Sequence, residues 1–140
     1  MMYVRLYSPD DAKQLVFNAV DKAANMDGWE QWAVINGNSG PAYTGLVGDK
    51  IVCAAGIRIV REGVGHLWSV FSSDIGQNKL SVFRGVKSML EILIKEFNFT
   101  RLRTESRIGF PESQRLLEHL GFKQGRIIMN KTHYSYFRSI

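Results

Sequence analysis

The chain has 140 residues, of which 45% are hydrophobic and 22% are charged. This composition excludes intrinsic disorder, and the length predicts a single domain over residues 1–140. No apolar run approaches the roughly 18 residues of a membrane-spanning helix, so we expect no membrane partner. The net charge of +5 is compatible with an anionic ligand, nucleic acid or an acidic partner and does not choose among them.

The single cysteine, Cys53, excludes an intramolecular disulfide. It stands in the apolar run 51–55, so we expect a buried side chain rather than a reactive thiol. A chain without disulfides is typical of the cytoplasm, where we expect this protein to reside. The three histidines show no metal-ligand spacing, and we therefore expect no metal ion.

The first half of the chain predicts a strand, two helices and three further strands. Residues 3–7 alternate in character, as a strand does, and Ser8, Pro9 and the two aspartates after them are typical of a helix start. A second, weaker helix is expected over residues 28–35. Three strands separated by tight turns follow, over residues 43–47, 51–60 and 66–71.

In the second half, apolar residues at intervals of three or four predict a long helix from Leu80 to Phe97. A strand over residues 100–104 follows, so this strand, helix and strand together predict a parallel pair. A short helix is expected to begin at Pro111 and to end at Gly121, which takes the left-handed cap position. Two strands over residues 122–130 and 133–137 complete the chain.

The segment 112–123 reads Glu-Ser-Gln-Arg-Leu-Leu-Glu-His-Leu-Gly-Phe-Lys. With the order of the elements, it resembles the Ser-x-x-Leu-Leu-x-x-x-Gly-Phe ending of the GNAT (GCN5-related N-acetyltransferase) superfamily. Trp68, the serine-containing loop after it and the step Phe83-Arg84 resemble the small GNAT-like proteins of tailed phages. The resemblance implies an α/β (α+β) GNAT fold, a mixed, mostly antiparallel sheet of six to seven strands flanked by three to four helices.

The resemblance also implies that acetyl-coenzyme A binds between the fourth and fifth strands, with its pyrophosphate on N–H groups at the start of the long helix. The family's Gln/Arg-x-x-Gly-x-Gly/Ala loop is nearest to residues 82–87, from which Val82 and Lys87 depart. A second placement uses residues 73–79, with Gly76 for flexibility and Lys79 for charge. The cofactor-binding residues expected from the fourth strand and the first placement are Ser69, Val70, Phe71, Arg84, Gly85, Val86 and Lys87.

Three catalytic features common in the family are missing from this chain. Phe110 stands where many members have asparagine, Leu117 stands where a tyrosine acts as general acid, and no glutamate lies between Leu67 and Phe71. Positioning and backbone donors can still support acetyl transfer. As substitutes we expect His66 as the base and Tyr134 as the proton donor. Other candidates are Tyr136, Glu105 and Ser106.

These residues predict an N-acyltransferase that moves an acetyl group from acetyl-coenzyme A to a primary amine of a small molecule or a peptide. The alternative, which the missing residues favour, is a non-catalytic GNAT-like binding module or a phage structural or host-interaction protein. Nucleic-acid binding is less expected because no nucleic-acid motif accompanies the basic residues Lys79, Arg84, Lys87, Arg101, Arg103 and Arg107. Trp29, Trp32 and Tyr43 are candidates for an acceptor pocket, and analogy with the family leaves a homodimer open.

Overall fold

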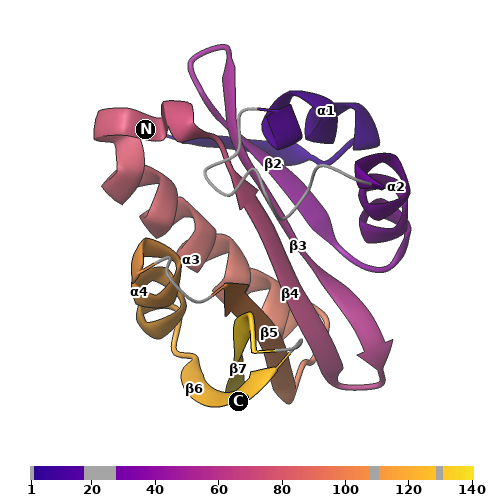
Figure 1. Ribbon diagram of the computed structural model, residues 1–140. Coiled ribbons are helices and arrows are strands. Elements are labelled where there is room, and N and C mark those ends of the chain that lie inside the picture. Colours follow the sequence, from indigo (N-terminus) through magenta and orange to yellow (C-terminus); the bar gives the residue numbers. More distant parts are fainter. Residues whose placement is uncertain (1, 18–27, 108–110, 129–130) are drawn as a thin grey trace. The chain divides into compact units, whose positions relative to one another are not determined.

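The computed structural model describes residues 2–17, 28–107, 111–128 and 131–140 (Figure 1). These residues form four α-helices and a seven-stranded sheet with the strand order β1-β2-β3-β4-β5-β7-β6. Neighbouring strands in the sheet are mostly antiparallel, and β4 and β5 are parallel, as the strand–helix–strand pattern predicts. The predicted fold class is therefore confirmed.

The chain divides into two compact units. Unit 1 comprises residues 1–58 and 68–86, and unit 2 comprises residues 59–67 and 87–140. The long elements β3 (Lys50–Arg61), β4 (Val64–Phe71) and α3 (Lys79–Glu96) each contribute residues to both units. The expectation of a single domain over residues 1–140 stays a prediction.

In unit 1, β1 (Tyr3–Leu6) pairs with β2 (Ala42–Val47), and β2 pairs with the first residues of β3. The helices α1 (Pro9–Phe17) and α2 (Trp29–Asn38) contact each other (Figure 1). The predicted second helix is thus present and extends three residues beyond residue 35. The 3₁₀ segment η2 (Ser73–Asn78) connects the end of β4 to α3.

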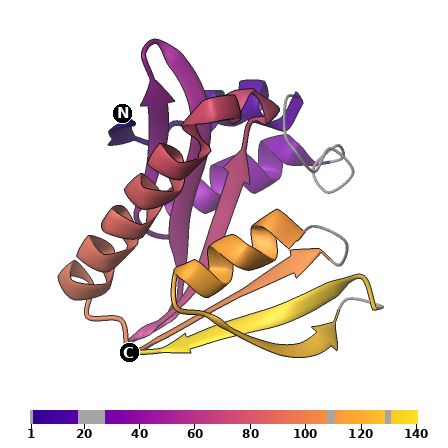
Figure 2. The ribbon, with the colours of Figure 1, turned by 90° about the vertical axis from the view of Figure 1, so that its left-hand side faces the viewer.

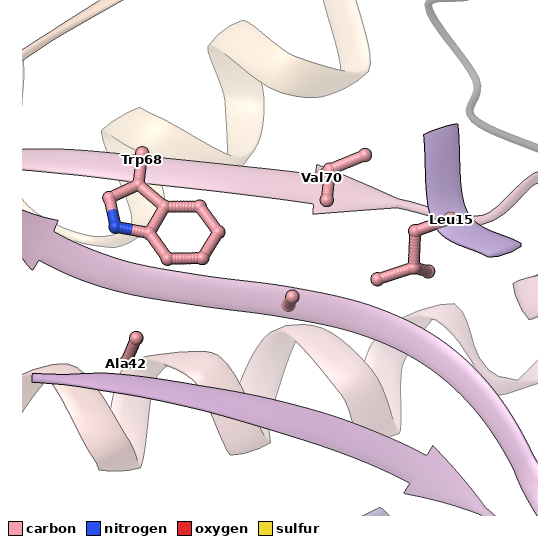
Figure 3. Close-up of a cluster of buried hydrophobic side chains, with 5 residues drawn as sticks. Leu15, Ala42, Trp68 and Val70 are labelled. Atoms are coloured by element: carbon pink, nitrogen blue, oxygen red, sulfur yellow. The ribbon is translucent and has the colours of Figure 1, made fainter. Parts of the chain in front are cut away.

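The core of unit 1 surrounds Trp68, whose side chain is 6% exposed. Its indole meets the ring of Tyr7 edge-on at 5.1 Å and the ring of Trp32 edge-on at 5.4 Å. Other buried members of this cluster are Leu15, Ala42, Ala54 and Val70 (Figure 3). Residues of α1, β2, β3 and β4 therefore meet in one buried cluster, of which Trp68 is the largest side chain.

Asp11 is a buried carboxylate at the start of α1 that joins three elements. Arg5 on β1 donates to both of its oxygens at 2.8 and 2.9 Å, and Thr44 on β2 donates at 2.7 Å. The Ser8 N–H donates at 3.1 Å, which caps the helix. Burial alone would raise the pKa of Asp11, but these hydrogen bonds and the charge of Arg5 outweigh burial and lower that pKa.

Asp11→Asn is expected to lower the free energy of unfolding at pH 7 by about 1–3 kcal/mol, because the ionised acceptor of these bonds is lost. The folded-state pKa lies below the unfolded one, so this contribution is present above about pH 4 and is lost as pH falls through the folded-state pKa. Urea unfolding of both proteins at pH 7 and pH 3 should show a smaller difference at pH 3. An equal difference at both values would contradict the assignment.

In unit 2, β5 (Arg101–Arg107) pairs with β4 over three residues, from Val64↔Arg101 to His66↔Arg103. Strand β7 (His133–Ser139) lies between β5 and β6 (Lys123–Ile128) and is antiparallel to both. The predicted strand over residues 122–130 is β6, and residues 129–130 lie outside the described part. Helix α4 (Pro111–His119) lies over one face of these strands (Figure 2).

Helix α4 ends as its sequence predicts. Gly121 adopts a positive φ of 91°, and the Phe122 N–H bonds to the Leu117 carbonyl at 2.9 Å. The Arg138 guanidinium, which lies beside Gly121, donates to the Leu120 carbonyl at 2.8 Å and to Glu91 on α3 at 2.7 Å. Arg138 therefore ties the end of α4 and the second half of α3 to strand β7.

Candidate functional site

The end of β4 presents alternate residues to opposite sides. Val70 is buried in the core beside Trp68, while Ser69 is exposed. Phe71 packs edge-on against Phe83 of α3, with ring centroids 5.7 Å apart. Alternate residues of a strand face opposite sides, so Ser69 lies on the α3 side together with Phe71. The side chain of Val70 points to the other side, into the core.

The turn before α3 has the geometry that favours anions. Gly76 interrupts η2 with φ 46° and ψ −122°, a backbone conformation that strongly favours glycine. A Cβ atom added at Gly76 would meet nothing within 4 Å, so its backbone faces open space. The helical stretch that leads into Lys79 starts directly after this break. The start of a long helix directly after an exposed glycine, with a lysine at its first position, suits a phosphate group.

The segment 82–87 lies inside α3 and forms no loop. Val82 and Val86 are buried, and a Cβ atom at Gly85 would overlap the side chain of Met2. Gly85 therefore has a packing reason to be glycine. Arg84 and Lys87 are exposed, one turn apart on the helix. Of the two loop placements, the helix start favours residues 73–79.

In unit 2, His66 on β4 lies against Glu105 on β5. Its Nε2 is 3.1 Å from Glu105 Oε2, and the two side chains are 14% and 30% exposed. The pairing of β4 with β5 stops at the register pair His66↔Arg103, so His66 marks the point where this pairing ends. When Nε2–H donates to the carboxylate, Nδ1 holds the lone pair that accepts a proton.

Tyr134 lies on the opposite face of the same strands. It is the register partner of Ser106, whose Oγ is 2.9 Å from Ser113 Oγ on α4, so both residues face α4. Tyr136 on this face is 1% exposed, and burial first, then the charges of Glu118 and Tyr134, raises its pKa. Tyr136 is therefore a core residue. The structure does not bring His66 and Tyr134 together, because the two side chains lie on opposite faces of the sheet.

Two residues at which the chain departs from the GNAT pattern are Leu117 and Phe110, and the structure describes the first of them. Leu117 is buried with Leu116 under α4 and has no proton to give. Phe110 lies outside the described residues. Among the candidates for an acceptor pocket, Trp32 packs on the core of unit 1, while Trp29 and Tyr43 are half-buried.

Within the described residues, no group of His, Cys, Asp and Glu side chains is arranged to hold a metal ion. None of the helices in that part of the chain combines the length and the apolar character needed to cross a bilayer. Arg101 and Arg103 are exposed on β5, where alternation puts them and Glu105 on one face. The order Arg-Leu-Arg-Thr-Glu over residues 101–105 is the sequence signal for this shared face.

No family model and no curated protein matches the chain by sequence. Solved structures match over its full length. The acetyltransferase from Streptococcus agalactiae 2603 is 16% identical with a TM-score of 0.78, and the match covers 99% of this chain and 98% of that one. For the IAA acetyltransferase from Bacillus cereus ATCC 14579 the values are 13% and 0.74, with both chains covered completely.

A third structure, AAC(6')-Ib in complex with ribostamycin and coenzyme A, is 14% identical with a TM-score of 0.73 and a coverage of 99% of this chain and 93% of that one. The likeness to small phage-encoded proteins stays a prediction. At such low identities, the likeness to the three solved structures establishes the fold alone. The chain therefore has the α/β fold of the GNAT acetyltransferases.

Proposed function

We propose that this protein is an N-acetyltransferase that moves the acetyl group of acetyl-coenzyme A to a primary amine. The observation that carries the proposal is the full-length match to acetyltransferase structures, one of which contains coenzyme A and an aminoglycoside. The open turn at Gly76 before a long helix fits the pyrophosphate of that co-substrate. Residues 76–79 would hold the phosphates, with Arg84 and Lys87 adding positive charge on the same helix.

The catalytic roles fall to side chains of unit 2. Bound acetyl-coenzyme A supplies a thioester whose carbon–sulfur bond breaks as the carbon–nitrogen bond forms. His66, held by Glu105, accepts the proton that the amine loses. The departing sulfur takes a proton from water, and Tyr134, which faces the α4 side, is the alternative acid for a thioester bound on that face.

Isothermal titration with coenzyme A tests the cofactor part of the proposal. Gly76→Ala is expected to weaken the affinity about tenfold, because a side chain at positive φ costs roughly 1–2 kcal/mol and forces the turn to rearrange. Gly48→Ala is the matched control. Gly48 also has a positive φ, of 61°, with nothing within 4 Å of an added Cβ, but it lies in the turn between β2 and β3.

Equal loss of affinity in both glycine variants would show that the effect is one of stability and not of phosphate binding. Arg84→Glu separates the two loop placements, since a larger loss there than at Gly76 would favour residues 82–87. If coenzyme A does not bind to the wild-type protein at all, the enzymatic proposal fails, and the alternative of a non-catalytic binding module takes its place.

A further inference from the structure

The net charge of the chain is confined to unit 2. Unit 1 contains seven Lys and Arg and seven Asp and Glu residues, whereas unit 2 contains eleven Lys and Arg against six Glu. The excess of five positive charges therefore belongs entirely to unit 2. A charge excess gathered on one part of a protein indicates an anionic partner there.

The strand register places part of this charge in a line across one sheet face. Arg103 is the register partner of His66 on one side and of Phe137 on the other, and Phe137 is the partner of Lys123. Register partners on neighbouring strands point to the same face. His66, Arg103, Phe137 and Lys123 thus form one row across β4, β5, β7 and β6, which we call the cationic row.

The cationic row lies on the face opposite α4. Thr104, Ser106, Tyr134 and Tyr136 occupy the α4 side, and no described helix of unit 2 covers the other side (Figure 2). Arg103 and Lys123 are exposed, and Phe137 is half-buried. The Arg101 guanidinium lies 5.9 Å from the centre of the Phe137 ring, which adds a further cation to the middle of the row.

The dimensions of the row favour an extended chain as its occupant. Three strand spacings of about 4.8 Å separate His66 from Lys123, roughly 14 Å in all, which an extended peptide spans with about four residues. A single phosphate or carboxylate at Arg103 would leave Lys123 two spacings away. An extended peptide with carboxylate side chains two residues apart presents both on one side, about 7 Å from each other, within reach of both cations.

We propose that the acceptor is a peptide amine followed by carboxylate side chains within about four residues, bound across the cationic row with the amine at His66. This assignment of a substrate class rests on the proposed function. It sets the chain apart from AAC(6')-Ib as seen with ribostamycin, because aminoglycosides are polycations and this row would repel them. The acidic side chains would supply the attraction that orients the amine toward its base.

Fluorescence anisotropy with three labelled peptides tests the proposal without any need for turnover. The peptides Ala-Glu-Ala-Glu-Ala, Ala-Gln-Ala-Gln-Ala and Ala-Lys-Ala-Lys-Ala carry a free amino terminus and the label at the other end. The acidic peptide is expected to bind at least about tenfold more tightly than the neutral one at low salt, with a difference that shrinks as salt is added. The basic peptide should bind most weakly.

Arg103→Glu and Lys123→Glu should each abolish most of this preference, and the double variant should prefer the basic peptide. Lys95→Glu is the matched control, because it makes the same charge change on an exposed residue of α3 in unit 2. If Lys95→Glu weakens the acidic peptide as much as Arg103→Glu does, only net charge matters and the proposal is overturned. Equal binding of the acidic and neutral peptides overturns it as well.

A phosphorylated small amine that displaces the acidic peptide at equal concentration would also overturn the assignment to peptides. Titration with coenzyme A and an acetylation assay keep this inference separate from the proposed function. Acetylation of neutral and basic amines with no preference for acidic peptides would leave the enzyme standing and remove the acceptor class. Selective binding of the acidic peptide without binding of coenzyme A would leave the peptide site standing and remove the enzymatic function.

Discussion

His66→Ala is expected to lower kcat/KM for acetyl transfer by about 10²–10⁴-fold, the usual effect of removing a general base. The imidazole lies 3.1 Å from Glu105, which fixes the ring and leaves Nδ1 to take the proton of the amine. Glu105→Gln retains a hydrogen-bond acceptor without the charge, so a smaller loss of about tenfold is expected. Initial rates over a range of amine concentrations at saturating acetyl-coenzyme A provide the measurement.

Added imidazole should restore part of the activity of His66→Ala, because a free base can occupy the space left by the side chain. If His66 is a base, His66→Ala should leave the affinity for coenzyme A unchanged. If its role is structural, imidazole should give no rescue and the affinity for coenzyme A should fall. Full activity in His66→Ala would remove this residue from the mechanism and leave catalysis to positioning and backbone donors.

Trp68→Ala is expected to lower the free energy of unfolding by about 3–5 kcal/mol, the largest stability effect we expect in the chain. The indole is 6% exposed, meets Tyr7 and Trp32 of α2 edge-on, and belongs to the buried cluster of unit 1. Alanine would leave a cavity that Tyr7 and Trp32 cannot fill without giving up their own contacts. Urea unfolding at pH 7 measures the difference.

Trp68→Phe is the control for this prediction. The indole Nε1–H is buried without a hydrogen-bond partner among the described residues, so phenylalanine removes an unsatisfied donor and keeps most of the ring. Its cost should be under about 2 kcal/mol. A loss as large as that of alanine would show that the indole nitrogen has a partner, and a small loss in alanine would show that the cluster collapses around the cavity.

The sequence predicted those parts of the fold that local patterns decide. The apolar spacing from Leu80 onward identified α3, and Gly121 marked the end of α4 because a left-handed cap requires glycine there. The parallel pairing of β4 with β5 followed from the strand–helix–strand order. Each of these features depends on residues that are close together in the chain.

Features that depend on residues far apart in the chain could not be predicted from the sequence. Gly85 suggested a phosphate loop. In the structure Met2, which is far from Gly85 in sequence, occupies the space that a Cβ atom at Gly85 would need. The lateral position of β7 between β5 and β6 put Lys123, Phe137 and Arg103 in one row, and no local pattern encodes that order. Of the candidate site, sequence reasoning supplied His66 and Glu105 separately, and only the fold places them in contact.

Cys53 is buried at 2% exposure beside Met2, and burial raises the pKa of its thiol to about 12. The thiolate that reacts with colorimetric disulfide reagents is therefore nearly absent at neutral pH. Because the chain contains no other cysteine, product coenzyme A would be the principal source of signal in such an assay. The protein's own packing thus provides a low background for continuous detection of acetyl transfer, and it leaves surface positions open to site-specific labels on introduced cysteines.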